Sequence, residues 1–474
     1  MNKALLFQLW IFSIGFLISN LCKRTFDPVF RALISVPIGW AVFGIAATIV
    51  YSIYFNPIAQ PIVLVVLLLS TVVLLGLNIN RGFLTRDSIV LGGVTVLVLT
   101  GVFILFNLLR IITMSPDSSY MARFGQNIGL GDYEGSRIVF SMWGPLVPFI
   151  HSFTNVLDQK LYWQYQPILS LHLVAIVLYT IYGVIREKES VLLSFIAASV
   201  LVTLMVLSDI FVFHVFYIHV NIISALYMYL FVFALGKMQQ QAGRSYEVLA
   251  LISLIAFSLV RIEAPIFAIA ILLVTSFWNK FSYAARLRVI VPFVVLFIAW
   301  YARVYFILPD NPDLLTKKLA VAFSSMFVGF GVFTALSGVG RVHSIIQRTH
   351  LITIAGLLLL GVTLTVLKPE DMLTSLRSIV RNALVDGDWG LTWYVVGFIA
   401  IELYRVGQRS IERHWIFIVL ISYCLLVYNV AFFGGSYRIG SSDSGNRLIL
   451  QAVPVVLLYL GTGVSGLYKS LRSC

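Results

Sequence analysis

The polar stretch Met114–Ser152 holds three carboxylates, which are rare elsewhere in this chain. Asp117, Asp132 and Glu134 lie in it, whereas the 474 residues include only 20 acidic side chains. A carboxylate at the edge of an apolar bundle can take a proton from a substrate hydroxyl or bind a divalent cation. The simpler alternatives are that Asp117 caps a helix over 118–128 and that the other two lie in a solvated, glycine-rich turn.

A second group of polar residues lies in and before FVFHVFYIHVN at 211–221. Asp209 is a candidate second acid, or else a charge at the end of a helix where water begins. His214 and His219 are five residues apart, a spacing that places them off a shared helical face and disfavours a metal site. We interpret them, together with Asn221, as interfacial or hydrogen-bonding residues.

Four more ionisable residues lie within or beside apolar segments. Arg261 and Glu263 interrupt the apolar stretch 247–278, and ionisable groups inside a membrane segment are functional candidates. The guanidinium fork of arginine matches a phosphate, and a structural Arg–Glu pair is the alternative. Arg438 and Arg447 flank a Gly/Ser loop and are candidates for contact with a phosphate or with lipid headgroups.

The composition places these residues in a membrane protein. The chain is 60% hydrophobic and 11% charged, against about 25% charged residues in soluble domains. Apolar runs of about 20 residues recur, and each is long enough to cross a bilayer. We predict an all-α, polytopic transmembrane bundle of about 13–15 spans, with a small external loop region that carries short interfacial helices. The expected spans are 4–22, 32–54, 61–78, 88–109, 165–185, 191–208, 213–235, the two halves of 247–278, 289–307, 320–338, 350–367, 389–404, 415–433 and 446–466.

We expect one membrane-embedded domain without a separate soluble part. Its parts are N-terminal helices over 1–109, an external catalytic loop over 110–164 and the remaining helices over 165–474. The first apolar run lacks a small-residue cleavage site, so we interpret it as a retained helix. In the loop, a helix over 117–128 should end at glycines, and a segment that starts at 143–148 should lie in the membrane interface.

The charges predict an orientation. The lysines and arginines of the short loops all lie on one side if 247–278 forms two short helices hinged at Arg261 and Glu263. By the positive-inside rule that side is cytoplasmic and the N-terminus lies outside. The external face then gathers 13 of the 20 acidic residues, namely Asp117, Asp132, Glu134, Asp158, Asp209, Glu263, Asp310, Asp313, Glu370, Asp371, Asp386, Asp388 and Asp443. The net charge of +13 fits orientation and contact with lipid headgroups, so we expect no nucleic-acid partner.

The first polar stretch resembles a loop of a known superfamily. PDSSY at 116–120, the alanine and glycines that follow, and WGPL at 143–146 resemble the first external loop of the glycosyltransferase C superfamily. Its members are integral membrane enzymes that use polyprenyl-phosphate sugars. The chain departs from the family pattern because three extra spans precede this loop.

Two later stretches are similar to the same superfamily. LISLIAFSLVRIEAPIFAIAILL at 251–273 resembles its helix hairpin, with the arginine and glutamate in place and Leu259-Val260 at the position of the usual threonine. NRLILQAVPVVLLYL at 446–460 resembles a late helix that opens on arginine and an aromatic residue. Arg447 and Pro454 match that pattern, and Leu448 replaces the aromatic residue.

The resemblance implies an enzyme that transfers a sugar from a polyprenyl-phosphate donor to a lipid, glycan or protein acceptor. It implies Asp117 as catalytic base or metal ligand and Asp209 as a second catalytic or metal-binding acid, with Mg²⁺ or Mn²⁺ as the optional cation. Tyr120 would stack on the sugar. The residues expected to bind the donor with it are Arg261, Glu263, Arg438 and Arg447. The resemblance also implies a multi-pass protein of the bacterial inner membrane with its active site on the periplasmic face.

Two other functions fit a basic protein with many spans. An O-antigen or exopolysaccharide polymerase or ligase would concentrate functional arginines in large later external loops, whereas here the first acidic loop dominates. A flippase or transporter of lipid-linked sugars would show paired broken helices in two matching halves. The sequence predicts one broken helix, at 247–278, and no evident counterpart.

Overall fold

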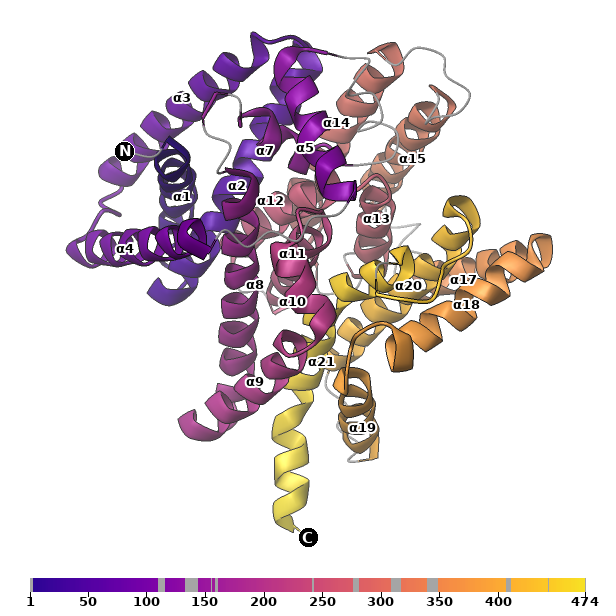
Figure 1. Cartoon of the computed structure of the whole chain (residues 1–474). Coiled ribbons are helices and arrows are strands. Elements are labelled where there is room, and N and C mark those ends of the chain that lie inside the picture. Colours follow the sequence, from indigo (N-terminus) through magenta and orange to yellow (C-terminus); the bar gives the residue numbers. More distant parts are fainter. Residues whose placement is uncertain are drawn as a thin grey trace. The chain divides into compact units, whose positions relative to one another are not determined.

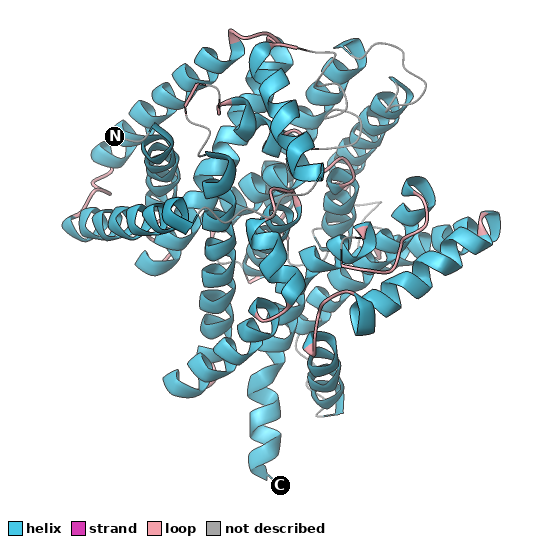
Figure 2. Ribbon diagram, in the orientation of Figure 1, coloured by secondary structure: helices cyan, strands magenta, loops and turns pink. Residues whose placement is uncertain are grey.

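The chain is helical almost throughout. The computed structural model describes residues 3–109, 116–132, 144–154, 156–157, 161–240, 243–275, 281–307, 317–338, 348–405, 411–441 and 443–473. These residues form α-helices joined by short connections, and no β-strand occurs among them (Figures 1 and 2). The predicted all-α class is confirmed.

Among the described residues, ten helices are long and apolar enough to cross a membrane. They are α1 (Lys3–Leu21), α2 (Pro28–Ile53), α3 (Ala59–Asn80), α4 (Arg86–Leu109), α8 (Leu161–Arg186), α11 (Asn221–Gln239), α14 (Tyr283–Ile307), α17 (Thr349–Leu367), α20 (Ile411–Gly434) and α21 (Ser444–Ser473). Several present bare apolar surface; on α3, Leu68, Leu69 and Val72 are each more than half exposed. Such surface is stable only against lipid, so the chain is a multi-pass membrane protein.

The number of long spans within the described residues is lower than the predicted 13–15. It is ten, or eleven if α9 (Val191–Val206) and α10 (Asp209–Phe216), which meet at 73°, count as one broken span. The other expected spans do not qualify: α12 (Arg244–Val260), α13 (Ala264–Thr275) and α19 (Thr392–Arg405) are at most 17 residues long, and the apolar part of α15 (Lys317–Leu336) is Ala320–Leu336. A hydropathy profile counts a short helix and the apolar connection beside it as one long span. This is why it predicts more long spans than the described residues form.

The expected span 213–235 is wrong for the same reason. The chain leaves the helix after Phe216 and starts a new one at Asn221. By contrast, the predicted division of 247–278 into two helices is confirmed, because α12 ends at Val260 and α13 begins at Ala264.

The chain divides into two compact units that alternate along the sequence. Unit 1 comprises residues 1–172, 216–268 and 280–343, and unit 2 comprises 173–215, 269–279 and 344–474. Of the predicted site residues, Asp117, Tyr120, Arg261 and Glu263 belong to unit 1. Asp209, Arg438 and Arg447 belong to unit 2.

Helix α2 forms the centre of unit 1, where it packs against α1, α3, α7, α12 and α14. It begins at Asp27, whose carboxylate accepts a hydrogen bond from the Phe30 amide. Its contact with α1 is made at two glycines: a Cβ on Gly15 would lie 1.7 Å from the Ser35 carbonyl oxygen, and one on Gly39 would lie 2.0 Å from the Ile11 carbonyl oxygen. Small residues allow this close backbone packing inside a membrane.

Unit 2 contains an amphipathic helix between the expected spans 350–367 and 389–404. Helix α18 (Pro369–Arg381) buries Met372 and Ser375 and exposes Leu373, Leu376 and Val380 along one side. Apolar residues beside exposed charges are typical of a helix that lies at a membrane surface.

Candidate functional site

Helix α5 (Pro116–Leu130) carries Asp117 in its first turn. The predicted helix is confirmed, and it ends before Gly131, whose φ of +71° suits a residue without a Cβ. The unpaired amides of a first helical turn attract a carboxylate. The Asp117 side chain is 31% exposed, so it lies at the surface of unit 1 and can meet a substrate there.

Two aromatic side chains contact the Asp117 carboxylate. The Tyr217 hydroxyl donates a hydrogen bond of 2.9 Å to Oδ2, and Nε2 of His219 lies 3.7 Å from the same oxygen. The Tyr217 and His219 rings stack at 5.0 Å between centroids, with an interplanar angle of 6°. Both residues belong to the connection 217–220 between α10 and α11.

The amide of Gln166, on α8, holds this connection in place. Its Nε2 donates to the Tyr217 carbonyl oxygen, and its Oε1 accepts from the His219 backbone amide at 3.1 Å. Gln166 is buried, so both ends of its side chain exchange water for backbone partners. The connection is therefore a rigid part of unit 1.

The hinge after α12 joins the same network. Arg261 has an extended backbone, with φ −140° and ψ 152°. Its Nε donates to Glu263 Oε1 at 2.5 Å and its Nη1 donates to Asn221 Oδ1 at 3.0 Å. Asn221 Nδ2 lies 2.9 Å from His219 Nδ1. A continuous polar chain thus connects Asp117 with the Arg261–Glu263 pair, two features predicted separately.

Helix α7 (Leu146–Ser152) packs α5 against the rest of unit 1. All seven of its residues are buried against other parts of the protein, and the position of this segment in the membrane interface stays a prediction. Two glycines one turn apart on α5 make the contact: a Cβ on Gly125 would lie 2.3 Å from His151 Cβ, and one on Gly129 would lie 2.7 Å from the Ser152 carbonyl oxygen. Trp143, the first residue of the segment predicted to lie in the membrane interface, lies outside the described residues.

His151 on α7 is a neutral core residue. Burial lowers its pKa to about 3, and its Nε2 lies 3.2 Å from the Tyr165 hydroxyl. It therefore adds no charge to the site at physiological pH.

Gly144, just before α7, touches the hinge. A Cβ at this position would lie 2.1 Å from the Val260 carbonyl carbon and 2.3 Å from the Arg261 nitrogen. We expect Gly144→Ala to destabilise the protein by about 1–3 kcal/mol, because backbone atoms on both sides must move. A lower thermal midpoint in detergent would show this. Gly93→Ala is the matched control, since nothing lies within 4 Å of a Cβ there; equal midpoints for the two variants would contradict the prediction.

The structure describes two further residues of the predicted catalytic loop. Tyr120, one turn after Asp117, is 51% exposed and its ring stacks on Phe124 at 6.0 Å, so one face of the ring can meet a sugar. Asp132 follows Gly131, and its backbone amide donates to the Asn127 carbonyl at 2.8 Å, which agrees with the turn interpretation. Glu134 lies outside the described residues.

The predicted residues of unit 2 belong to α10, to the loop before α21 and to the first turn of α21. Asp209 is exposed in the first turn of α10. Arg438 and Arg447 flank a loop organised by Asp443, whose carboxylate accepts from the Arg438 amide at 2.8 Å and from the Gly445 amide at 2.7 Å. The Arg438 side chain is exposed, and Arg447 Nη2 lies 3.5 Å from Ser444 Oγ. A pairing of Asp209 with Asp117 stays a prediction.

Metal binding has limited support in the described parts of the chain. No group of three or more His, Cys, Asp or Glu side chains there is arranged to hold an ion. Asp117 has a phenol and an imidazole beside it, whereas Mg²⁺ and Mn²⁺ prefer several oxygen ligands. The residues described do not form a metal site, and we derive no step through a metal.

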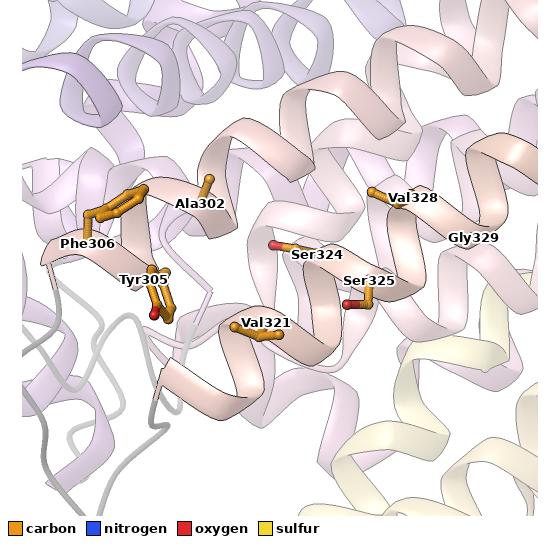
Figure 3. Close-up of a pocket in the computed structure, with 8 residues that line it drawn as sticks. All are labelled: Ala302, Tyr305, Phe306, Val321, Ser324, Ser325, Val328 and Gly329. Atoms are coloured by element: carbon orange, nitrogen blue, oxygen red, sulfur yellow. The ribbon is translucent and has the colours of Figure 1, made fainter.

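A groove of about 530 Å³ lies between α14 and α15 in unit 1 (Figure 3). Tyr305 and Phe306 line it from α14, and the hydroxyls of Ser324 and Ser325 line it from α15. Among the described residues that line it, none has a charged side chain. The groove is suited to an apolar group, and Asp117 does not line it.

Sequence reasoning missed Tyr217 and Gln166 and undervalued His219. A signal for the connection exists in YIHVN, where polar and apolar residues alternate from Tyr217 to Asn221. Alternation with period two departs from the 3.6-residue period of a helix, and this is a signal for the break between α10 and α11. Comparison of the chain with protein-family models, with curated proteins and with solved structures finds no match.

Proposed function

We propose that the chain is a membrane glycosyltransferase that moves a sugar from a polyprenyl-phosphate donor to a lipid, glycan or protein acceptor. The observation that supports this most is Asp117 itself. It is a partly exposed carboxylate at a helix N-terminus, oriented by Tyr217 and His219, in the loop that resembles the glycosyltransferase C superfamily. A membrane-embedded chain with such a group suits a reaction between a lipid-linked donor and a hydroxyl.

In the proposed reaction the acceptor hydroxyl attacks the anomeric carbon of the donor sugar. The new bond joins the acceptor oxygen to that carbon, and the bond from the carbon to the phosphate oxygen breaks. Asp117 takes the hydroxyl proton as general base, and polyprenyl phosphate leaves with the bonding electron pair. Tyr120 would stack on the sugar ring as its anomeric centre becomes electron-deficient.

The arginines are the proposed contacts to the donor phosphate. Arg261 already donates from Nε and Nη1, and among the residues that the structure describes Nη2 has no hydrogen-bond partner. Arg261 would therefore offer the phosphate Nη2, while Glu263 orients the guanidinium. Arg438 and Arg447 are proposed as further phosphate contacts within unit 2. Asp209, on α10 of unit 2, is the proposed second acid. We place the site on the periplasmic face of a bacterial inner membrane.

The direct test is an assay on the purified full chain in lipid nanodiscs. The chain is incubated with a panel of undecaprenyl- and dolichyl-phosphate sugars and with extracted membrane lipids and glycans as acceptors. We expect one donor to yield equimolar polyprenyl phosphate and glycosylated acceptor. Consumption of a preassembled lipid-linked repeat in place of a single-sugar donor would indicate a polymerase. No product from any donor would reject the proposal.

One observation favours a second candidate, a transporter of lipid-linked sugars. Each unit contains an interrupted apolar helix: the hinge at Arg261 lies in unit 1, and the 73° bend between α9 and α10 lies in unit 2. Paired broken helices are typical of secondary transporters. Movement of a labelled lipid-linked sugar across a liposome membrane without a covalent product would support this candidate against the enzyme.

A further inference from the structure

In the hydrogen-bonded network beside Asp117, the donor and the acceptor of each bond are fixed. An arginine side chain can only donate hydrogen bonds, so Asn221 Oδ1, 3.0 Å from Arg261 Nη1, must be the acceptor. The other end of the Asn221 side chain is then its NH₂ group, which only donates. It lies 2.9 Å from His219 Nδ1, and this nitrogen must therefore accept with its lone pair. A neutral imidazole with a lone pair on Nδ1 carries its proton on Nε2.

This reasoning places a proton on the nitrogen that faces Asp117. His219 Nε2 lies 3.7 Å from Asp117 Oδ2, the oxygen that already accepts from Tyr217. That distance exceeds a hydrogen bond, but hydrogen bonds of a catalytic group are often long without substrate and shorten in the complex. His219 is only 1% exposed, so water does not compete for this position.

The same chain opposes a second proton on His219. An imidazolium has N–H groups on both nitrogens, and its Nδ1–H would point at the N–H of Asn221. Rotation of the Asn221 amide does not relieve this clash, because it would then place NH₂ against the Arg261 guanidinium. Three charged groups belong to this hydrogen-bonded network. Asp117 lies next to His219 Nε2, whereas Arg261 and its partner Glu263 lie on the other side of Asn221.

We propose that Arg261, through Asn221, fixes the tautomer of His219, and that His219 serves Asp117 as a hydrogen-bond donor rather than as a second base. His219 and Asn221 are positioning residues in this arrangement. The proton that Asp117 takes from an acceptor hydroxyl finds no lone pair on Nε2, so it stays on the carboxylate until it leaves to solvent. The role in transfer rests on the proposed function; the tautomer does not.

The tautomer is measurable without any substrate. The full chain is labelled with ¹⁵N-histidine and examined by NMR in lipid bilayers at pH 7, with the His219 signals assigned by their loss in His219→Gln. In the wild type we expect a protonated Nε2 and an unprotonated Nδ1. Arg261→Gln should give a mixture of tautomers, because glutamine can also accept and so frees the Asn221 amide to rotate. Asn221→Asp should move a proton to Nδ1, because a carboxylate accepts there.

Arg288→Gln is the matched control. It removes a second Arg–Glu pair of unit 1, in which Arg288 Nε lies 2.5 Å from Glu247 Oε2, and it should leave the His219 signals unchanged. The proposal is overturned if wild-type His219 carries a proton on Nδ1, or if folded Arg261→Gln retains the single Nε2–H form. Should the tautomer be as expected while no donor yields product, the glycosyltransferase function fails and the fixed tautomer stands.

Discussion

Asp117→Asn is expected to lower the rate of sugar transfer by about 10²–10⁴-fold, the usual contribution of a general base. An amide has the shape of the carboxylate, but it does not take up a proton near neutral pH. Its oxygen can still accept from Tyr217, 2.9 Å away in the wild type, so the fold of α5 should be retained. The measurement is the initial rate of glycosylated product at equal amounts of folded protein in nanodiscs.

The matched control for this variant is Asp132→Asn. Asp132 is the next acidic residue along the chain and lies in the turn after α5. Its replacement should leave transfer within a few-fold of the wild type. Near-normal transfer by Asp117→Asn would remove the base from the proposed mechanism, and equal losses in both variants would show that the loop acts only through its overall charge.

Arg261→Ala is expected to destabilise the protein by about 1–3 kcal/mol, because it removes one partner of a partly buried ion pair. The side chains of Arg261 and Glu263 are 17% and 13% exposed. Without the guanidinium, Glu263 keeps a partly buried charge and Asn221 loses its donor, 3.0 Å away in the wild type. The thermal midpoint of the purified chain in one detergent measures the effect.

A double variant separates the lost pair from the lost packing. Arg261→Ala with Glu263→Gln removes the uncompensated charge, so its midpoint should recover part of the loss. Arg288→Ala breaks a pair whose arginine is 43% exposed, and it should change the midpoint far less. If the double variant is no more stable than Arg261→Ala alone, the Arg261–Glu263 pair is not the source of the loss.

Many of the helices and helix boundaries of this protein can be predicted from local sequence. Apolar runs without charges predict membrane helices, because each run must satisfy its own backbone hydrogen bonds in lipid. The charged residues Arg261 and Glu263 correctly predicted a break between two helices, because an ionisable pair disfavours a continuous apolar span. The glycines after Ile128 similarly predicted the end of α5, which the structure places at Leu130. Each of these predictions depends on residues within a few turns of one another.

The partners of Asp117 depend on contacts across the chain. Tyr217 lies 100 residues from Asp117, and Arg261 lies 40 residues from Asn221, so no local pattern states that they meet. Hydropathy merged 213–235 into one span, because the apolar residues of the connection at 217–220 look like helix. The burial of α7 likewise needed α5 to pack on it. Asp117 could therefore be selected from its sequence context, whereas the chain that orients it arises from the packing of α5, α8, α11 and the hinge after α12.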